Sequence, residues 1–588
     1  MKENVVVMPL IHADEFAEAS KLKSLRMALL SPAIMKILKI DDLNKIYEKF
    51  EAHEGLAFIE AVLEELSISY EVNENSIPAE GPFLAIANHP YGALDGLILL
   101  HIFGQKRPDF KVMANFLLQR ILTLQSFFIP VNPFDEGLVK GGSFGGLRAC
   151  LQHLQAGHPI GIFPAGAVSA FESKSKKIVD KQWSHTVAKI IMKTKVPVVP
   201  VHFKGTNSRL FHLLGRIHAN LGTVRLPSEL LNKKGKKIQV RVGKTIPYKN
   251  LADLQDAEEL TLYLRARTYA IGSSLEVKKY FSPPFLVRKK PKDLIPATPQ
   301  ALLEKELQQI TAKRLLTQAP FEVYLADSRE IPFILNEIGR LRELTFRTVG
   351  EGTNKSFDRD RFDLDYGHLF VWDTLEKCIV GAYRIGKGDE LFDKYGPKGF
   401  YLNTLFKFDE NFYPILQSAV ELGRSFIRKE YQQKYLPLFL LWRGILAFIN
   451  QNSSYKFVIG PVSISSYFSP ISKALITAYI RKHYFEPELS KWVTARKEFA
   501  ATAEDTDTQI LLKTHEGDLK KIDRLIAEIE PYGLSMPVLL KKYIKQNAKI
   551  IGFNIDPKFN NALDGLMVMN VEDIPQETVA LLKSKTKI

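Results

Sequence analysis

A histidine and an aspartate in the segment NHPYGALDG have the types and the spacing of an acid–base pair. His89 follows the apolar run PFLAIA and precedes Pro90, which disfavours helical backbone at the histidine. We therefore place His89 on a loop at the carboxyl edge of a sheet, where α/β proteins bind ligands. Asp95 falls in the first turn of a predicted helix and can turn back to accept an imidazole N–H. The other ring nitrogen is then a base for a hydroxyl that attacks a thioester. The alternative is structural: a histidine in a turn and an aspartate that starts a helix.

Two further segments accompany this pair. Residues 162–169 read IFPAGAVS, a strand that runs into a Pro/Gly turn, and residues 196–208 read VPVVPVHFKGTNS, a strand that ends in a polar loop. This ordered set resembles the glycerolipid acyltransferase superfamily, in particular its bacterial hemolysin-like branch of lyso-aminolipid O-acyltransferases. The resemblance covers about residues 75–250. It implies that His89 is the base, that Asp95 orients it, and that Gly166 with the neighbouring backbone belongs to the acceptor loop.

The segment departs from the superfamily pattern at two points. Five residues separate the histidine from the aspartate, where four are usual, and FPAGAVS stands in place of FPEGTRS. A phosphate-holding arginine is thus missing, which argues against a glycerol-phosphate acceptor. Candidate cations elsewhere are Arg148, Lys204 and Arg209, each of which is alternatively a solvated or structural charge. Residues 209–218 alternate basic and apolar side chains, as expected of a helix on an anionic bilayer or of an ordinary surface helix.

A second set of charged residues lies between residues 341 and 442, in apolar surroundings. Its members are Arg342 and Phe346 in RELTF, Asp360 and Asp363 in DRDRFD, Arg384 in IVGAYRI, and Glu421 and Arg424 in ELGR. We predict a helix over residues 417–430, on which Glu421 and Arg424 share one face and can pair. A surface salt bridge is the alternative explanation of this pair.

The order RxxxF, DxxD, GxxR and ExxR resembles the acyl-homoserine-lactone synthases and the acyl-carrier-protein-dependent amino-acid N-acyltransferases, which have a GNAT-type fold. The resemblance covers about residues 320–480. Within it, Glu421 is our first choice to accept a proton from the substrate ammonium, and Asp363 is the second. Arg342, Arg384 and Arg424 would hold the amino-acid carboxylate or order the site, and Phe346 and Asp360 complete the predicted substrate-binding set. A pyrophosphate-binding Q/RxxGxG/A loop is not evident, which favours a carrier-protein donor over acetyl-CoA.

The elements that position these residues alternate between strands and helices in the first half of the chain. The predicted strands are 82–87, 111–114, 159–163, 196–203 and 237–242, and the predicted helices are 14–30, 41–68, 93–103, 145–155 and 183–193. This pattern predicts an α/β domain with a mostly parallel sheet flanked by helices. The second half predicts an α+β, GNAT-like domain. Its expected strands are 322–326, 368–373, 378–385, 456–460 and 549–553, with helices at 331–346, 417–430, 439–450 and 516–546.

A stretch rich in proline and lysine around residues 282–300 separates the two halves. We therefore expect a helical region at 1–72, an O-acyltransferase domain at 73–285, a linker at 286–302 and a GNAT-like N-acyltransferase domain at 303–588.

Composition and charge narrow the class of protein. Lys and Arg number 80 and Asp and Glu 65, for a net charge of +15, which favours an acidic partner such as an anionic membrane or a carrier protein. A basic–aromatic module of recognised pattern is missing, so we predict no nucleic-acid partner. Two cysteines without a CxxC predict neither a disulfide framework nor a thiolate zinc site, and we expect no metal. The richest apolar run, 435–449, contains Arg443, and the first residues lack signal-peptide order.

A chain with these two domains in this order resembles the bifunctional acyltransferases that make ornithine or glycine lipids. This resemblance implies that the C-terminal domain transfers a 3-hydroxyacyl group from acyl carrier protein to the α-amine of an amino acid. The N-terminal domain would then acylate the 3-hydroxyl, with an acyl thioester of acyl carrier protein or coenzyme A as co-substrate and no other cofactor. We expect a bacterial, cytoplasmic protein, peripheral on the inner face of the cytoplasmic membrane. The alternative is a lysophospholipid (1-acylglycerol-3-phosphate) acyltransferase with an accessory GNAT-like domain.

Overall fold

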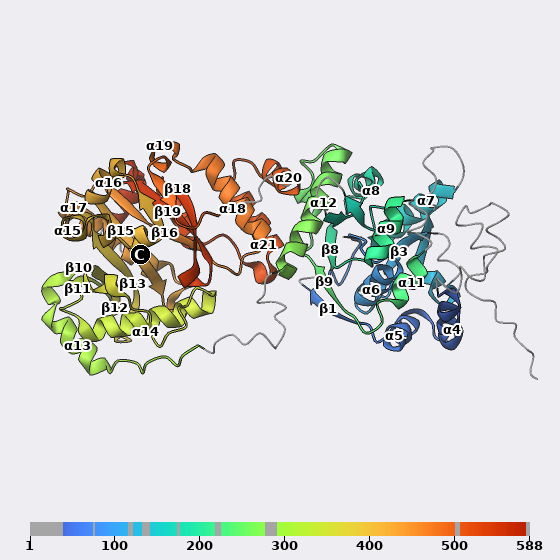
Figure 1. Ribbon diagram of the computed structural model, residues 1–588, viewed down its shortest axis with the longest axis horizontal. Helices are drawn as coiled ribbons and strands as arrows, with labels where there is room; N and C mark the ends of the chain where they lie inside the picture. Colours follow the sequence, from blue (N-terminus) through green and yellow to red (C-terminus); the bar gives the residue numbers. More distant parts are fainter. Residues whose placement is uncertain are drawn as a thin grey trace, which may run out of the picture. The chain divides into compact units, whose positions relative to one another are not determined.

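The computed structural model describes residues 39–74, 77–115, 121–131, 142–172, 177–217, 225–276, 291–499 and 506–583. The chain divides into two compact units, each with its own sheet (Figure 1). Within the described residues, no helix is both long and apolar enough to cross a membrane. The helix predicted at 14–30 lies outside these residues.

The first unit is built on a seven-stranded sheet with the order β1-β9-β8-β2-β5-β3-β4. Its strands are β1 (Ser69–Glu74), β2 (Leu84–Ala87), β3 (Lys111–Asn115), β4 (Phe128–Val131), β5 (Ile160–Ile162), β8 (Val198–Lys204) and β9 (Lys237–Val242). All neighbours pair in parallel except β8 and β9. The prediction of a mostly parallel sheet is confirmed, and β1 is a strand that the sequence reasoning missed. A separate hairpin joins β6 (Ala170–Glu172) to β7 (Lys177–Val179).

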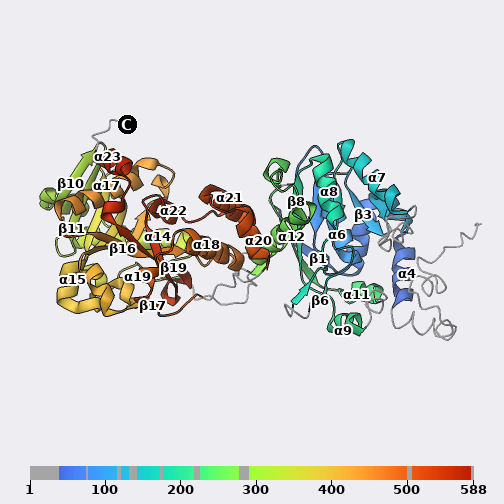
Figure 2. The ribbon, with the colours of Figure 1, turned by 90° about the horizontal axis from the view of Figure 1, so that it is seen from above.

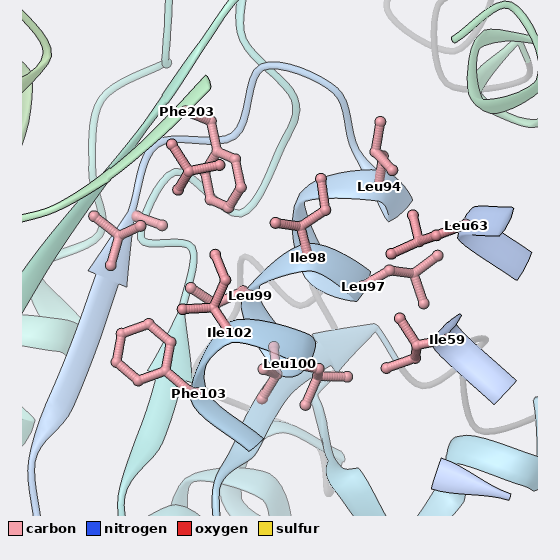
Figure 3. Close-up of a cluster of buried hydrophobic side chains, with 14 of the residues drawn as sticks. Ile59, Leu63, Leu94, Leu97, Ile98, Leu99, Leu100, Ile102, Phe103 and Phe203 are labelled. Carbon is pink, nitrogen blue, oxygen red and sulfur yellow. The ribbon is translucent and has the colours of Figure 1, made fainter. Parts of the chain in front are cut away.

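Helices cover both faces of this sheet. They are α4 (Ile40–Phe50), α5 (Gly55–Glu65), α6 (Ala93–Gly104), α7 (Gly142–Gln155), α8 (His185–Thr194), α9 (Arg209–Ile217), α11 (Leu226–Leu231) and α12 (Ala257–Ser273). One face packs on α6, and α5 packs on α6 in turn. Ile98 and Leu99 of α6 lie toward Phe203 of β8, whereas Leu97 and Leu100 lie toward Ile59 of α5 (Figure 3). The other face packs on α12. Burial of α6 is nearly complete, which holds the loop in front of this helix in a fixed place.

The first unit also takes in residues 505–516 and 524–533, from a part of the chain that the sequence assigns to the second domain. Helix α20 (Thr506–Thr514) packs on α12, and Asp507 forms an ion pair with Arg265, 2.8 Å from Nη1 to Oδ1. Glu528 of α21 (Leu519–Ile529) pairs with the buried Arg267 at 2.7 Å. The chain thus returns to its first unit late in the sequence.

The second unit is built on an eight-stranded sheet with the order β10-β11-β12-β13-β15-β16-β19-β18. The strands are β10 (Arg314–Gln318), β11 (Phe321–Asp327), β12 (Gly367–Asp373), β13 (Cys378–Lys387), β15 (Ala419–Ile427), β16 (Phe457–Ile464), β18 (Lys549–Asp556) and β19 (Ala562–Asn570). All pairs are antiparallel except β15 and β16, which pair in parallel. This registered pairing covers only residues 419–421 against 457–459, so the two strands pair over a short length.

Helices α14 and α17 pack against this sheet. The helices of the second unit are α13 (Gln300–Gln309), α14 (Pro332–Val349), α15 (Gly388–Tyr395), α16 (Tyr413–Gln417), α17 (Tyr435–Gln451), α18 (Pro470–His483), α19 (Pro487–Ser490), α22 (Val538–Ile544) and α23 (Gln576–Lys583). Strands β14 (Phe406–Phe408) and β17 (Val493–Ala495) form a small antiparallel pair beside the main sheet.

Three element predictions were wrong. The helix expected at 417–430 is largely strand β15, which hydrogen-bonds to β13 on one side and to β16 on the other. The sheet pairing therefore overrides the helical propensity of AVELGR. The helix expected at 516–546 is interrupted around Pro531 and Pro537, since proline cannot continue a helix. The helix expected at 41–68 is two helices, separated before Gly55, whose φ is +59°.

Candidate active sites

His89 and Asp95 lie next to each other, as predicted, in the loop between β2 and α6. The histidine Nδ1 is 3.0 Å from Asp95 Oδ2. The same oxygen accepts the main-chain N–H groups of Tyr91 (2.8 Å) and Gly92 (3.0 Å). Burial raises the pKa of Asp95, while the contact with His89 and these N–H groups oppose the rise. A carboxylate fixed in this way holds the imidazole ring in one orientation.

The FPAGAVS turn holds the histidine in place. The ring of His89 stacks on Phe163, with 4.1 Å between ring centres, and the carbonyl of His89 accepts the N–H of Ser169 at 2.9 Å. The His89 side chain is 18% exposed, so the ring is reachable from outside. Within the described part of the chain, Nε2 has no hydrogen-bond partner. This nitrogen is therefore available as a base.

A second buried carboxylate, Asp180, was not found by sequence reasoning. Its Oδ1 accepts the main-chain N–H of His89 (3.1 Å) and the hydroxyl of Ser169 (2.6 Å), and its Oδ2 accepts the indole N–H of Trp183 (3.0 Å). Asp180 thus fixes the histidine backbone, while Asp95 fixes the ring. The residue lies 91 positions from His89 in a segment without a motif, so no local pattern marks it.

The loop that carries His89 is also hydrogen-bonded to strand β8. The side chain of Asn88 makes two hydrogen bonds to the main chain of Phe203, at 2.9 and 2.7 Å. The hydroxyl of Tyr91 donates to the carbonyl of Lys204 at 2.8 Å. At Gly205, φ is +137° and a Cβ atom would lie 1.6 Å from that hydroxyl, so this position requires glycine. The KGTNS loop therefore shapes the site through its glycine.

The predicted cations lie apart from the histidine. Arg148 on α7 and Arg209 at the start of α9 are exposed, and Lys204 is exposed with its Nζ donating to the carbonyl of Leu275 at 3.1 Å. Gly166, with φ +61°, is exposed and closes the FPAG turn by donating its N–H to the carbonyl of Phe163. None of these residues has a contact with His89 among those that the described residues make.

A buried cation that the sequence reasoning missed is Lys233. Its Nζ lies 5.1 Å from the ring centre of Tyr91, donates to the carbonyl of Thr206 at 3.3 Å, and is 3.6 Å from the buried carboxyl of Glu229. Glu229 in turn accepts the N–H and the hydroxyl of Ser208 at 3.0 and 2.5 Å. These groups fix the loop that follows β8.

In the second unit, Glu421 lies on β15 at the end of the short parallel pairing with β16. Its carboxyl is buried and accepts the hydroxyl of Tyr366 (2.5 Å) and the N–H groups of Leu402 (2.9 Å) and Tyr401 (3.1 Å). Burial raises the pKa of Glu421 to about 7, against the pull of these donors. A carboxyl that titrates near neutrality is suited to take and return a proton.

The predicted arginines and aspartates do come together, in one buried ionic network. Its members are Arg342, Arg384, Arg424, Asp358, Asp360 and Asp363. Arg342 Nη2 is 2.8 Å from Asp363 Oδ1 and also donates to the carbonyl of Asp358 at 2.9 Å. Burial alone would raise the pKa of Asp363, but Arg342 and Arg384 hold it well below its usual range. These contacts hold Asp363 within the network, and its role as the second base stays a prediction.

Arg384 and Arg424 share the carboxylate of Asp360. Arg384 Nη1 is 2.7 Å from Oδ1, and Arg424 Nη2 is 3.1 Å from Oδ2. The Nε and Nη2 atoms of Arg384 are buried without a hydrogen-bond partner among the described residues. Its guanidinium lies over the rings of Tyr366 and Tyr401, at 5.1 and 5.2 Å from the ring centres, and both residues contact Glu421. Unpaired donors beside a base are an arrangement that suits a substrate carboxylate.

Phe346 and two aspartates from the C-terminal strands also lie around the site of Glu421. Phe346 is partly buried against the cluster that holds Tyr366 and Tyr401. The hydroxyl of Tyr401 donates to Asp556 at 3.1 Å, and Asp564 on β19 accepts the hydroxyl of Ser463 at 2.6 Å. Burial raises the pKa of Asp564 to about 8. Both aspartates come from the last part of the chain, for which the sequence suggested no role.

Comparison with known proteins finds a family match in each part of the chain. Residues 18–278 match the acyltransferase family, and residues 341–442 match the acetyltransferase (GNAT) domain family. The glycine N(alpha)-acyltransferase of Phocaeicola vulgatus is 28% identical over 300 residues, which is 48% of this chain and 90% of that protein. The lyso-glycine lipid O-acyltransferase of Bacteroides thetaiotaomicron is 26% identical over 252 residues, 40% of this chain and 88% of that protein.

Among solved structures, the 1-acyl-sn-glycerophosphate acyltransferase PlsC from Thermotoga maritima has 19% identity and a TM-score of 0.25. The similarity covers 45% of this chain and 88% of that one.

Proposed function

Because this chain carries an acyltransferase domain followed by a GNAT domain and is an acyl-transferring enzyme, we propose that it builds an amino-acid-containing membrane lipid by two acyl transfers. One observation carries the proposal: a single chain is similar both to an N-acyltransferase of glycine and to an O-acyltransferase of lyso-glycine lipid. The second of these proteins, by its name, acts on a lipid of the kind that the first would supply. Glycine and ornithine are the two candidate amino acids.

The GNAT domain is proposed to perform the first transfer. Glu421, with a pKa of about 7, accepts a proton from the ammonium group, and the free amine attacks the carbonyl of a 3-hydroxyacyl thioester. An amide bond forms, the C–S bond breaks, and the thiol leaves with a proton. The unpaired Nε and Nη2 of Arg384 hold the amino-acid carboxylate. The donor is an acyl carrier protein, whose acidic surface would suit a chain with a net charge of +15.

The acyltransferase domain is proposed to perform the second transfer. Nε2 of His89 takes the proton from the 3-hydroxyl as its oxygen attacks a second acyl thioester, carried by acyl carrier protein or coenzyme A. Asp95, 3.0 Å from Nδ1, stabilises the imidazolium that forms. An ester bond forms, and the leaving thiolate receives the proton from His89. The product has one amide-linked and one ester-linked chain.

The order of the two steps follows from the chemistry. The hydroxyl that the second step acylates belongs to the acyl chain that the first step attaches. The intermediate has a single long chain and stays on a membrane face, so two activities in one polypeptide raise its effective concentration at the second site. We therefore propose that the protein acts at the inner face of a bacterial cytoplasmic membrane.

The test is to express the chain in a host without aminolipids and to analyse the lipids by mass spectrometry. The wild type should produce a diacylated aminolipid, and His89→Ala should accumulate the monoacyl, amide-linked form. Glu421→Gln should remove both products. Lys189→Ala, which changes an exposed lysine on α8, is the matched control and should leave both products unchanged. A host extract without any amide-linked lipid would refute the proposal.

An in vitro assay with lysophosphatidate tests the alternative function. A lysophosphatidate acyltransferase with an accessory GNAT domain would convert lysophosphatidate to phosphatidate in vitro and would need His89 but not Glu421. We expect no such activity, because alanine and valine replace the glutamate and arginine of FPEGTRS in the FPAGAVS turn.

A further inference from the structure

The outer face of helix α9 combines exposed leucines with exposed arginines. Leu210 is 45% exposed and Leu213 is 55% exposed, and Arg209 and Arg216 flank them on the same side of the helix. Such a face is unusual on a water-soluble surface, where large apolar side chains are normally scattered singly. We call these four residues the α9 face.

The orientation of α9 is fixed by its opposite side. Phe211 and His212 are buried, and His212 Nε2 lies 2.6 Å from the hydroxyl oxygen of Thr206. The N–H of Phe211 donates to the hydroxyl of Ser208 at 3.2 Å, and that hydroxyl donates to Glu229. Because these contacts hold the helix, the two leucines point away from the core of their unit and stay in solvent.

The hairpin of β6 and β7 lies next to α9, with β6 in contact with the helix (Figure 2). The guanidinium of Arg216 is 5.1 Å from the ring centre of Phe171 on β6. Lys177 on β7 is exposed, and Glu172 is the exposed acidic residue of the described part of the hairpin. Three exposed cations therefore oppose one anion around the leucines, which favours an anionic partner.

The α9 face borders the loop that carries His89. Asp180 directly follows β7 and accepts the main-chain N–H of His89 at 3.1 Å. Asn207, two residues before α9, donates to the carbonyl of Tyr91 at 3.4 Å. The residues that directly follow β7 and shortly precede α9 are thus hydrogen-bonded to the segment that holds the histidine.

We propose that the α9 face docks on an anionic phospholipid surface, with the leucines entering the interface and the arginines contacting lipid phosphates. Exposed leucines beside a strip of arginines on one helix are the pattern of a helix that lies in a membrane interface. The docked surface presents lipids next to His89, and this last consequence rests on the proposed function. A protein partner would require a complementary apolar and acidic surface and would not need lipid.

The experiment is co-sedimentation of the full chain with two kinds of vesicle. One kind is phosphatidylcholine alone, and the other contains phosphatidylglycerol as well. The wild type should bind the anionic vesicles more tightly. Arg209→Gln with Arg216→Gln should weaken that binding by roughly fivefold for each arginine. Leu210→Gln with Leu213→Gln should weaken binding to the anionic vesicles by about tenfold or more.

Two exposed residues outside α9 provide matched controls. Leu375→Gln changes a leucine that is 76% exposed in the turn between β12 and β13, and Arg148→Gln changes an exposed arginine on α7. Both should bind vesicles as the wild type does. Equal binding by the α9 variants and the wild type would overturn the docking proposal, as would a wild type that binds neither kind of vesicle.

Failure of docking and failure of the proposed function give different results. If only docking is wrong, the expression host still accumulates the aminolipid while the α9 variants bind vesicles normally. If only the proposed function is wrong, no aminolipid forms, but the α9 variants still lose vesicle binding. Circular dichroism of each variant checks that its fold is retained.

Discussion

Replacing Glu421 by glutamine separates the catalytic effect of this carboxyl from its effect on stability. In the folded protein the pKa of Glu421 is about 7, against an ordinary value of 4.5. The difference of about 2.5 pH units, at roughly 1.4 kcal/mol for each unit, means that ionising the buried carboxyl costs on the order of 3 kcal/mol. Because the folded state binds this proton more tightly than the unfolded state, wild-type stability falls as pH rises from about 4.5 to about 7.

Glutamine does not titrate, so the variant lacks this loss. Its amide nitrogen, however, cannot accept the N–H groups of Tyr401 and Leu402 as two carboxylate oxygens do, which costs about 1–3 kcal/mol at every pH. The unfolding free energy of Glu421→Gln relative to the wild type should therefore rise by on the order of 3 kcal/mol between pH about 4.5 and pH about 8. Denaturant titrations across this range measure the difference. A constant difference would refute the account of the buried carboxyl.

The catalytic effect has the opposite sign with pH. N-acyl transfer needs the ionised carboxylate, so the rate of the wild type should rise through pH about 7. Glutamine should lower the rate by roughly 10²–10⁴-fold, the usual contribution of a general base. Release of thiol from the acyl thioester gives the rate, and Glu410→Gln, an exposed glutamate in the same unit, is the control. A variant that keeps a tenth of the rate or more, or a wild-type profile without a step near neutrality, would contradict the assignment.

Three further predictions concern the remaining contacts. His89→Ala should lower the rate of O-acyl transfer by roughly 10²–10⁴-fold and leave N-acyl transfer unchanged, and equal loss of both in separate assays would contradict the division of labour. Gly205→Ala places a methyl group 1.6 Å from the Tyr91 hydroxyl and should destabilise the first unit by about 2–3 kcal/mol in denaturant titrations; adding Tyr91→Phe should recover part of this, and no recovery would argue against the clash. Arg384→Lys should raise the KM for the amino acid more than it lowers kcat, because lysine lacks the paired donors, and an unchanged KM would exclude the carboxylate contact.

The residues around His89 illustrate what could be predicted from the sequence. Asp95 is six positions away on a helix start, so local geometry alone brings it to the imidazole. The strands β2, β5 and β8 were predictable because parallel strands buried on both faces read as short apolar runs. Asp180 and Lys233 were not, because the contacts that place them form between segments far apart in the chain.

The second unit shows a different limit. The segment AVELGR has the composition of a helix, and only its partners β13 and β16 make it a strand. The pairing of Glu421 with Arg424 that a helix implied is therefore replaced by contacts with distant residues. Arg424 meets Asp358 and Asp360, and Glu421 meets Tyr366. The order of the charged residues was informative, while their individual partners depended on tertiary structure.

Residues 505–516 and 524–533 belong to the first unit although they follow most of the second unit in the sequence. This arrangement limits how the protein could be divided into two separate chains. The two relatives are separate proteins, each of which matches less than half of this chain. A gene fission between α12 and α13 would leave α20, with its Asp507 pairing with Arg265, encoded on the downstream gene. The upstream product alone would expose the surface of α12 that α20 covers. A separate first half would therefore need α20 supplied with it to cover that surface.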